Sequence, residues 1–339
     1  MDNLVLFNKN DLKSLLKNRS GESKFGKHIH LLSNFNSIYD EILNLDVTYV
    51  IFGIKEDIGV FANYGNVGTS RAWDAVLKPL LNIQSNEFTH ANKVLILGHL
   101  DYSKSLEKLK ELNQSQKKHI QKARKKVAKI DNDVSELVYQ IVKAGKIPII
   151  IGGGHNNAYG NIKGTSLALK EPINVVNFDA HSDFRIEEGR HSGNGFTYAL
   201  HEGFLDQYFI FGLHENYTPQ EIFQTLNKNK QIHYNTFESI AIRKERKFKK
   251  ELENALEIVS TRSFGVEFDC DAVENIPSSA MTPSGFNTIK ARRYVHFFSQ
   301  NKNAKYLHIC EASPTQETET QIGKFITYLI TDFIRANAS

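Results

Sequence analysis

The sequence predicts an α/β protein built on a mainly parallel β-sheet with helices on both faces. About eight short apolar segments, many of them rich in β-branched residues, have the length and composition of buried strands. Helical segments lie between them along the chain, and this alternation is typical of parallel sheets. No linker, repeat or low-complexity segment divides the 339 residues, so we expect one domain over residues 46–339 after an N-terminal extension over residues 1–45.

The expected strands follow in order after this polar, partly helical extension. The first lies at residues 46–53, is rich in β-branched residues and ends in a glycine. The second lies at residues 93–98. The other six are expected at residues 147–151, 174–178, 208–211, 232–234, 263–268 and 306–310.

A long helical region is expected between the second and third strands, at residues 103–145. It is strongly basic, with Lys117, Lys118, Lys122, Arg124, Lys125 and Lys126. A basic helix is one way to bind nucleic acid, but this one lacks interleaved aromatic residues and a base-reading motif. We therefore expect a solvated helix face and no nucleic-acid partner.

The composition is ordinary for a globular protein, with 40% apolar and 24% charged residues. No run of eighteen apolar residues occurs, so we expect no membrane span. The N-terminus lacks the basic and apolar regions of a secretory signal, and two cysteines, Cys270 and Cys310, are no disulfide framework. These features favour a cytoplasmic protein. The net charge of +4 says little about partners.

Acidic and histidine side chains cluster directly after the strand expected at residues 174–178. Asp179, His181 and Asp183 follow it within five residues. In open α/β folds, the loops after the carboxyl ends of strands carry the ligands and the chemistry. Two carboxylates and an imidazole that converge there are costly to bury unless they are paired or bind a metal. For this segment alone, a solvated turn is the alternative.

Three more strands end in residues of the same kind, and a parallel sheet would bring all four ends to one edge. His155 follows residues 147–151, Asp269 and Asp271 follow residues 263–268, and Glu311 follows the last strand. Taken singly, His155 could cap a helix and Asp269 could be an N-cap. Without Glu311 the set offers six ligands, whereas one zinc ion needs about three or four. Six donors, mostly oxygen, suit two divalent ions, and carboxylates favour hard ions such as Mn²⁺.

Four motifs resemble those of the ureohydrolase family, which includes arginase, agmatinase and formimidoylglutamase. They are Gly-Gly-Gly-His at 152–155, Asp-Ala-His-Ser-Asp at 179–183, Phe-Asp-Cys-Asp at 268–271 and Glu-Ala-Ser-Pro at 311–314. The resemblance implies an arginase-like three-layer αβα sandwich around an eight-stranded parallel sheet. It also implies two Mn²⁺ ions per chain, a small amidine or guanidine substrate, and a homo-oligomer.

The resemblance also implies a role for each ligand. Asp179 and Asp269 would bridge the two ions. His155 and Asp183 would complete the shell of one ion, and His181 and Asp271 that of the other. Two ions close together lower the pKa of a water molecule between them, which could then attack an amidine or guanidine carbon.

Several residues are candidates for contact with the substrate. Glu311 would hold the cationic C–N group, with an ordinary strand-end carboxylate as the alternative. Arg185 stands where arginase-like members have a neutral polar residue, and its guanidinium suits a substrate with more carboxylate at its far end. The loop at residues 189–196 resembles that of formimidoylglutamase, so Arg190 and Asn194 are further candidates. Either arginine could instead pair with a neighbouring glutamate.

His191, in the same loop, resembles the family's proton-shuttling histidine by type. The function that the resemblance favours is hydrolysis of N-formimino-L-glutamate to L-glutamate and formamide, as in histidine degradation. Two alternatives stay open: a guanidino hydrolase that releases urea, and a metal-binding member without turnover. The second is prompted by an altered loop at residues 272–286. Glu267, where small residues are usual, is a further departure from the family pattern.

Overall fold

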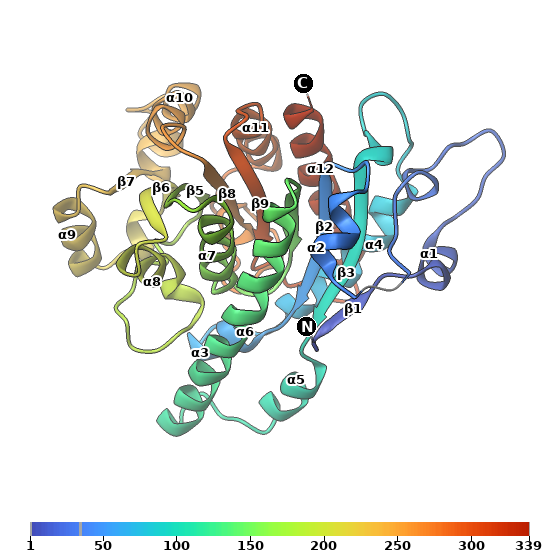
Figure 1. Cartoon of the computed structure of the whole chain (residues 1–339). Coiled ribbons are helices and arrows are strands. Elements are labelled where there is room, and N and C mark those ends of the chain that lie inside the picture. Colours follow the sequence, from blue (N-terminus) through green and yellow to red (C-terminus); the bar gives the residue numbers. More distant parts are fainter. Residues whose placement is uncertain (1, 34–35, 339) are drawn as a thin grey trace.

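A nine-stranded sheet forms the centre of the computed structural model, which describes residues 2–33 and 36–338 (Figure 1). Within these residues the strand order is β1-β3-β2-β4-β9-β8-β5-β6-β7. The strands are β1 Leu4–Leu6, β2 Tyr49–Lys55, β3 Val94–Asp101, β4 Ile147–Ile151, β5 Ile173–Phe178, β6 Leu205–Leu213, β7 Ile232–Thr236, β8 Phe264–Asp269 and β9 Ala304–Cys310. Strands β2 to β9 pair in parallel, which confirms the predicted fold class and all eight predicted strands.

Strand β1 is the ninth strand, and the sequence pattern does not predict it. It pairs antiparallel with β3, so that Leu4 lies opposite Leu100 and Leu6 opposite Gly98. Three residues are too few to show a periodic pattern, so only pairing with a preformed edge identifies them as a strand. The expected N-terminal extension thus contributes an edge strand, while its boundary near residue 45 stays a prediction.

Helices cover both faces of the sheet and complete three layers (Figure 1). One apolar core lies between the sheet and α1, α4, α10, α11 and α12, and the other lies under α2, α3 and α5 to α9. The helices are α1 Lys9–Leu15, α2 Ile38–Leu43, α3 Ile58–Ala62, α4 Ala72–Asn82, α5 Ser103–Leu109, α6 Lys117–Lys143, α7 Asn157–Leu169, α8 Gly195–His201, α9 Gln220–Lys228, α10 Phe248–Val259, α11 Thr288–Ser299 and α12 Glu319–Asn337. Across the described ranges, no helix has both the length and the apolarity that a bilayer span requires.

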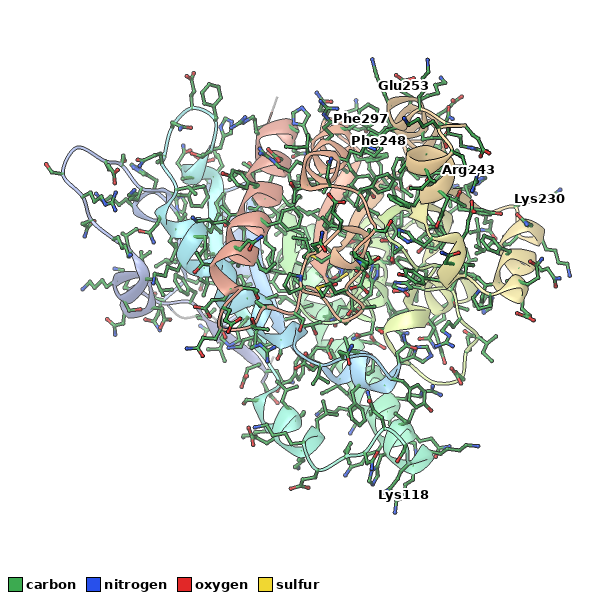
Figure 2. All side chains as sticks on the ribbon, turned by 180° about the vertical axis from the view of Figure 1, so that it is seen from behind. Lys118, Lys230, Arg243, Phe248, Glu253 and Phe297 are labelled. Atoms are coloured by element: carbon green, nitrogen blue, oxygen red, sulfur yellow. The ribbon has the colours of Figure 1, made fainter. Side chains whose placement is uncertain are left out.

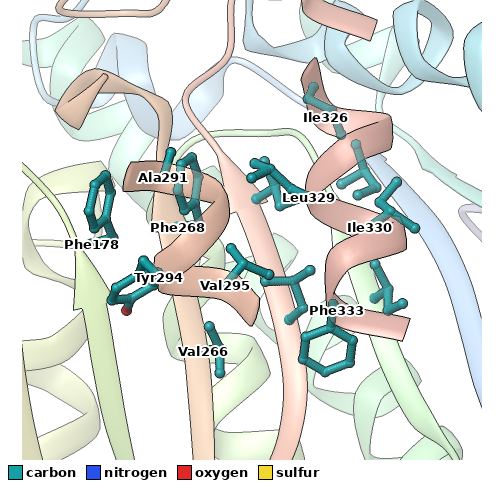
Figure 3. Packing of buried hydrophobic residues seen from close by; sticks show 14 of the residues in the cluster. Phe178, Val266, Phe268, Ala291, Tyr294, Val295, Ile326, Leu329, Ile330 and Phe333 are labelled. Carbon is teal, nitrogen blue, oxygen red and sulfur yellow. The ribbon is translucent and has the colours of Figure 1, made fainter. Parts of the chain in front are cut away.

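Aromatic and branched side chains fill the space between the central strands and α11 and α12 (Figure 3). The rings of Phe178 and Phe268, on neighbouring strands, stack with centroids 5.1 Å apart, and Tyr294 of α11 covers Phe178 at 4.8 Å. On the other face, α6 and α7 pack against each other, and the basic first turn of α6 extends beyond the body, with Lys118 exposed (Figure 2). The rigid inner packing fixes the strand ends in place.

The strand order decides where the chemically important residues meet. Strands β4, β9, β8 and β5 are consecutive neighbours in the sheet although they come from distant parts of the chain. Their carboxyl ends carry His155, Glu311, the pair at 269 and 271, and the group at 179–183. Because these strands are parallel, all four sets lie at one edge, as the sequence predicted.

Candidate metal centre

Asp179 and Asp269 hold matching positions at the ends of β5 and β8. Each is buried, and each turns one carboxylate oxygen back to its own chain: Asp179 Oδ1 accepts from the backbone N–H of His181, and Asp269 Oδ1 from that of Asp271, both at 2.7 Å. In addition, the Asp269 side chain caps the short helical turn that follows β8. The second oxygen of each carboxylate lies near His155, after β4.

Those second oxygens converge on the imidazole of His155. The Nδ1 atom of His155 lies 2.9 Å from Oδ2 of Asp183, 3.0 Å from Oδ2 of Asp269 and 3.2 Å from Oδ2 of Asp179. His155 is fully buried, and among the described residues neither of its ring nitrogens has a partner with hydrogen-bond geometry. One nitrogen and three oxygens around one point form a ready set of donors for a metal ion.

His181 and Asp271 form a second pair beside this set. The Nδ1 atom of His181 lies 3.6 Å from Oδ1 of Asp179 and 3.7 Å from Oδ2 of Asp271. Asp271 is fixed by the loop that follows β8, because its Oδ1 accepts from the backbone N–H of Ala280 at 3.1 Å and its Oδ2 from the Ser279 hydroxyl at 3.4 Å. The loop at residues 272–286, which departs from the family pattern, therefore supports a ligand position.

The electrostatics of the centre favour a cation. Burial raises the pKa of Asp183, Asp269 and Asp271, and the neighbouring carboxylates add to this shift for Asp183 and Asp269. Burial alone would lower the pKa of His181, but the negative charge of the nearby Asp179 outweighs this effect and raises the pKa to about 10. Four carboxylates and two imidazoles this close together and largely buried are stable with a divalent cation among them. The residues fit the predicted metal.

Glu311 lies at the floor of the same site. It follows β9 in the left-handed backbone region, with φ +60°, and its Oε1 accepts from the backbone N–H of His155 at 2.6 Å. Burial and the charge of Asp271 raise its pKa to about 8. Oε2 of Glu311 is buried and has no hydrogen-bond partner within residues 2–33 and 36–338. This oxygen therefore has unused capacity to accept a hydrogen bond.

A cleft of about 320 Å³ opens over these groups. His181, Asp183, Asp269, Asp271 and Glu311 lie at its base, and its walls include Asn63, Arg185 and Tyr217. Arg185 is exposed, and its Nη1 donates to Oδ1 of Asn63 at 3.0 Å. The Tyr217 ring stacks on His181 with centroids 5.7 Å apart. The cleft therefore carries carboxylates at its base and a guanidinium on its wall.

The structure does not bring Arg190, His191 and Asn194 to the lining of this cleft. Arg190 is buried; its Nε and Nη2 donate to the carboxylate of Asp131 at 2.9 and 3.3 Å, and its Nη1 donates to Oδ1 of Asn194 at 2.6 Å. The side-chain amide of Asn194 donates to the backbone of the loop at Ile186 and Gly189. In the described structure the side chains of Arg190 and Asn194 stabilise the loop that follows Arg185.

His191 is also buried within this loop. Its Nδ1 accepts from the backbone N–H of Gly193 at 3.1 Å, and its Nε2 lies 3.4 Å from Oε1 of Glu188. Burial, together with the positive charges of Arg124, Arg185 and Arg190, lowers its pKa to about 3. The imidazole is therefore neutral at physiological pH and buried away from the cleft, an arrangement that does not suit the predicted proton shuttle.

Two buried glutamates support the site and were not among the predicted residues. Glu56, after β2, accepts from the backbone N–H of Gly154 and the side chain of Asn157, both at 2.9 Å, and so holds the turn that carries His155. Glu267, on β8, lies behind His155. The sequence signal for Glu267 was its presence where the family has small residues, whereas Glu56 gave no signal.

Comparisons with known proteins agree with this fold. The family model described as "Arginase family" matches residues 49–334. A formimidoylglutamase of Streptococcus pyogenes serotype M12 (strain MGAS2096) is 25% identical over 298 residues, which cover 83% of this chain and 84% of the relative. The crystal structure of formimidoylglutamase from Bacillus subtilis subsp. subtilis str. 168 superposes with a TM-score of 0.74 at 17% identity, over 97% of this chain and 98% of that one.

A second solved structure, Trypanosoma cruzi formiminoglutamase with Mn²⁺, has a TM-score of 0.70 at 19% identity, over 94% of this chain and 99% of that one. The chain belongs to the arginase family. This membership confirms the resemblance, the fold and the class of enzyme expected from the sequence, a hydrolase that acts on C–N bonds.

Proposed function

We propose that this protein is a Mn²⁺-dependent hydrolase of linear amidines and that its substrate is N-formimino-L-glutamate. The observation that carries the proposal is the placement of Arg185 on the wall of the cleft that has Glu311 at its base. An amidine with two carboxylates at its far end is complementary to both. The names of the relatives in S. pyogenes and B. subtilis support the same substrate. The reaction would belong to histidine degradation.

The six predicted ligands would hold two ions per chain. His155, Asp179, Asp183 and Asp269 would hold one, and His181 and Asp271 would hold the second together with the two shared aspartates. When bound, the ions would lower the pKa of a water molecule and so supply a nucleophile at neutral pH. The buried carboxylates hold the centre rigidly through their backbone hydrogen bonds.

The other residues bind and orient the substrate. Oε2 of Glu311 would accept from the amidinium in a charge-assisted hydrogen bond and so place the formimino carbon over the centre. The Arg185 guanidinium would bind the glutamate carboxylates. Water oxygen adds to the formimino carbon, the bond from this carbon to the glutamate nitrogen breaks, and a proton from water goes to the leaving amine. The products are formamide and L-glutamate.

Product analysis tests the proposal. Mn²⁺-loaded protein is given N-formimino-L-glutamate, arginine, agmatine and guanidinobutyrate in parallel, with Asp179→Asn as the inactive control. Formamide and glutamate from the first substrate alone are the expected result. Urea from one of the others would keep the metal chemistry and overturn the substrate. Two bound ions and no product from any of the four would overturn this substrate and point to the metal-binding member without turnover. Cytoplasmic location and homo-oligomerisation remain predictions.

A further inference from the structure

Glu267 is a carboxylate buried in the middle of the sheet. It lies on β8, two residues before Asp269, and is fully buried. Two residues in an extended strand place their side chains on the same face, so Glu267 and Asp269 project to the same side of the sheet. A carboxylate in such a place is costly unless its oxygens are paired, and its partners therefore indicate what it does.

Two residues of the neighbouring strand β9 hold this carboxylate. His308 is the register partner of Glu267, and its Nδ1 lies 2.6 Å from Oε2 of Glu267. The Tyr306 hydroxyl donates to Oε1 at 2.8 Å. Both partners are fully buried, so the carboxylate is fixed in one orientation. In that orientation Oε2 also lies 3.5 Å from Nε2 of His155.

Gly265 provides the space that this arrangement needs. It is the register partner of Tyr306, and a Cβ atom at this position would lie 2.1 Å from Cζ of the tyrosine ring. Any larger residue at 265 would displace the ring and so withdraw its hydroxyl from Glu267. Gly265, Glu267, Tyr306 and His308 thus form one connected set, and Glu267 is the member that departs from the small residue usual in the family.

We propose that Glu267 is a positioning residue for His155, a role that rests on the proposed metal centre. An imidazole that binds an ion through Nδ1 carries its N–H on Nε2, and Oε2 of Glu267 lies 3.5 Å from that atom. The lone pair is then on Nδ1, the atom that lies among the oxygens of Asp179, Asp183 and Asp269. Glu267 would stabilise the ion-bound form of His155, with its N–H on Nε2, and restrain the rotation of its ring.

Measurement of Mn²⁺ binding without substrate tests this role. In Glu267→Gln, which keeps the size of the side chain, we expect the affinity for one of two ions to fall by about 10–100-fold. The affinity for the other ion is expected to stay near that of the wild type. In a His155→Asn background, Glu267→Gln should cause no further loss, because its effect passes through His155. Isothermal titration calorimetry or Mn²⁺ electron paramagnetic resonance gives both affinities.

Two results would overturn the inference. One is wild-type affinity of Glu267→Gln for both ions. If only the stability of the metal-free protein falls in this variant, the pair of Glu267 and His308 is purely structural, and the inference is overturned as well. The other is an equal loss of affinity with and without His155. Should Glu267→Gln fail to fold, Tyr306→Phe takes its place. This substitution removes the hydroxyl that donates to Glu267 and leaves the charge of the carboxylate unchanged. Mn²⁺ affinities of Tyr306→Phe with and without His155→Asn are then compared in the same way.

The outcome is separable from that of the proposed function. Wild-type protein that binds no Mn²⁺ would overturn the metal centre and the inference with it. Wild-type protein that binds Mn²⁺ but releases no formamide would overturn the proposed substrate alone, and the binding experiment on Glu267 would proceed unchanged.

Discussion

The backbone N–H of His155 donates a 2.6 Å hydrogen bond to Oε1 of Glu311. These residues follow β4 and β9, which are neighbours in the sheet although 156 positions separate the two residues in the sequence. The bond joins the turn that carries a candidate metal ligand to the carboxylate proposed to bind substrate. It fixes Oε1, while Oε2 is left without a hydrogen-bond partner among the described residues.

Glu311→Gln is expected to lower kcat/KM by about 10–100-fold, the range of one charge-assisted hydrogen bond. The amide oxygen of glutamine can still accept from His155, so Mn²⁺ binding should be unchanged. Steady-state kinetics and metal analysis of the same preparation check both statements. Glu317→Gln, at an exposed position in the following loop, is the matched control. Wild-type kcat/KM in Glu311→Gln would contradict the assignment.

Asp179→Asn is expected to abolish Mn²⁺ binding and activity together, because this carboxylate is proposed to contribute to both ion positions. A ligand that binds only the folded state stabilises it by about 2.7 kcal/mol when its free concentration is 100 times its Kd. A thermal melt with and without Mn²⁺ should therefore show a rise in Tm for the wild type and none for the variant. The exposed Asp40→Asn should behave as the wild type. A full Mn²⁺-dependent rise in Asp179→Asn would refute the site.

Arg185→Gln is expected to change substrate selection. Loss of the guanidinium removes a charge-assisted contact with carboxylate, so kcat/KM for N-formimino-L-glutamate should fall by about 10–100-fold. Any slow turnover of agmatine, which has no carboxylate, should not fall. Arg262→Gln is the control, since Arg262 pairs with Asp206 near the opposite edge of the sheet. An equal loss on both substrates would show that Arg185 acts through the fold.

The buried His191 predicts a pH dependence of stability. Its pKa in the folded state is lowered to about 3, so between pH 3 and its usual value of about 6.5 the unfolded chain binds more protons than the folded one. The contribution of His191 to the free energy of unfolding is fully present above pH 6.5. It is lost as pH falls toward 3, and the loss is at most about 5 kcal/mol.

Chemical denaturation of the metal-free protein at several pH values measures this loss. His191→Gln cannot take up that proton, so its free energy of unfolding should fall less between pH 6.5 and 4 than that of the wild type. His201→Gln, whose side chain is 55% exposed, serves as the control. Identical pH profiles for the wild type and His191→Gln would show that the histidine is accessible to protons in the folded state.

The sequence by itself determined the strands and the types of residue at their ends. Buried strands leave a local record in apolar, β-branched runs such as residues 147–151, and the ligand motif at 179–183 lies within five residues. Parallel pairing then placed these ends at one edge. The prediction missed β1, because its three residues become a strand only by pairing with β3.

Only the tertiary structure decided which residues of this edge meet. The order β4-β9-β8-β5 results from crossovers, and it brings His155 within 3.2 Å of carboxylates from two other strands. Arg190, a candidate for substrate contact, instead pairs with Asp131, 59 positions away. Glu267 looked like an isolated departure until β9 placed His308 and Tyr306 against it. A local sequence pattern indicates which residues are buried, whereas the fold of the whole chain decides which residue pairs with a buried charge.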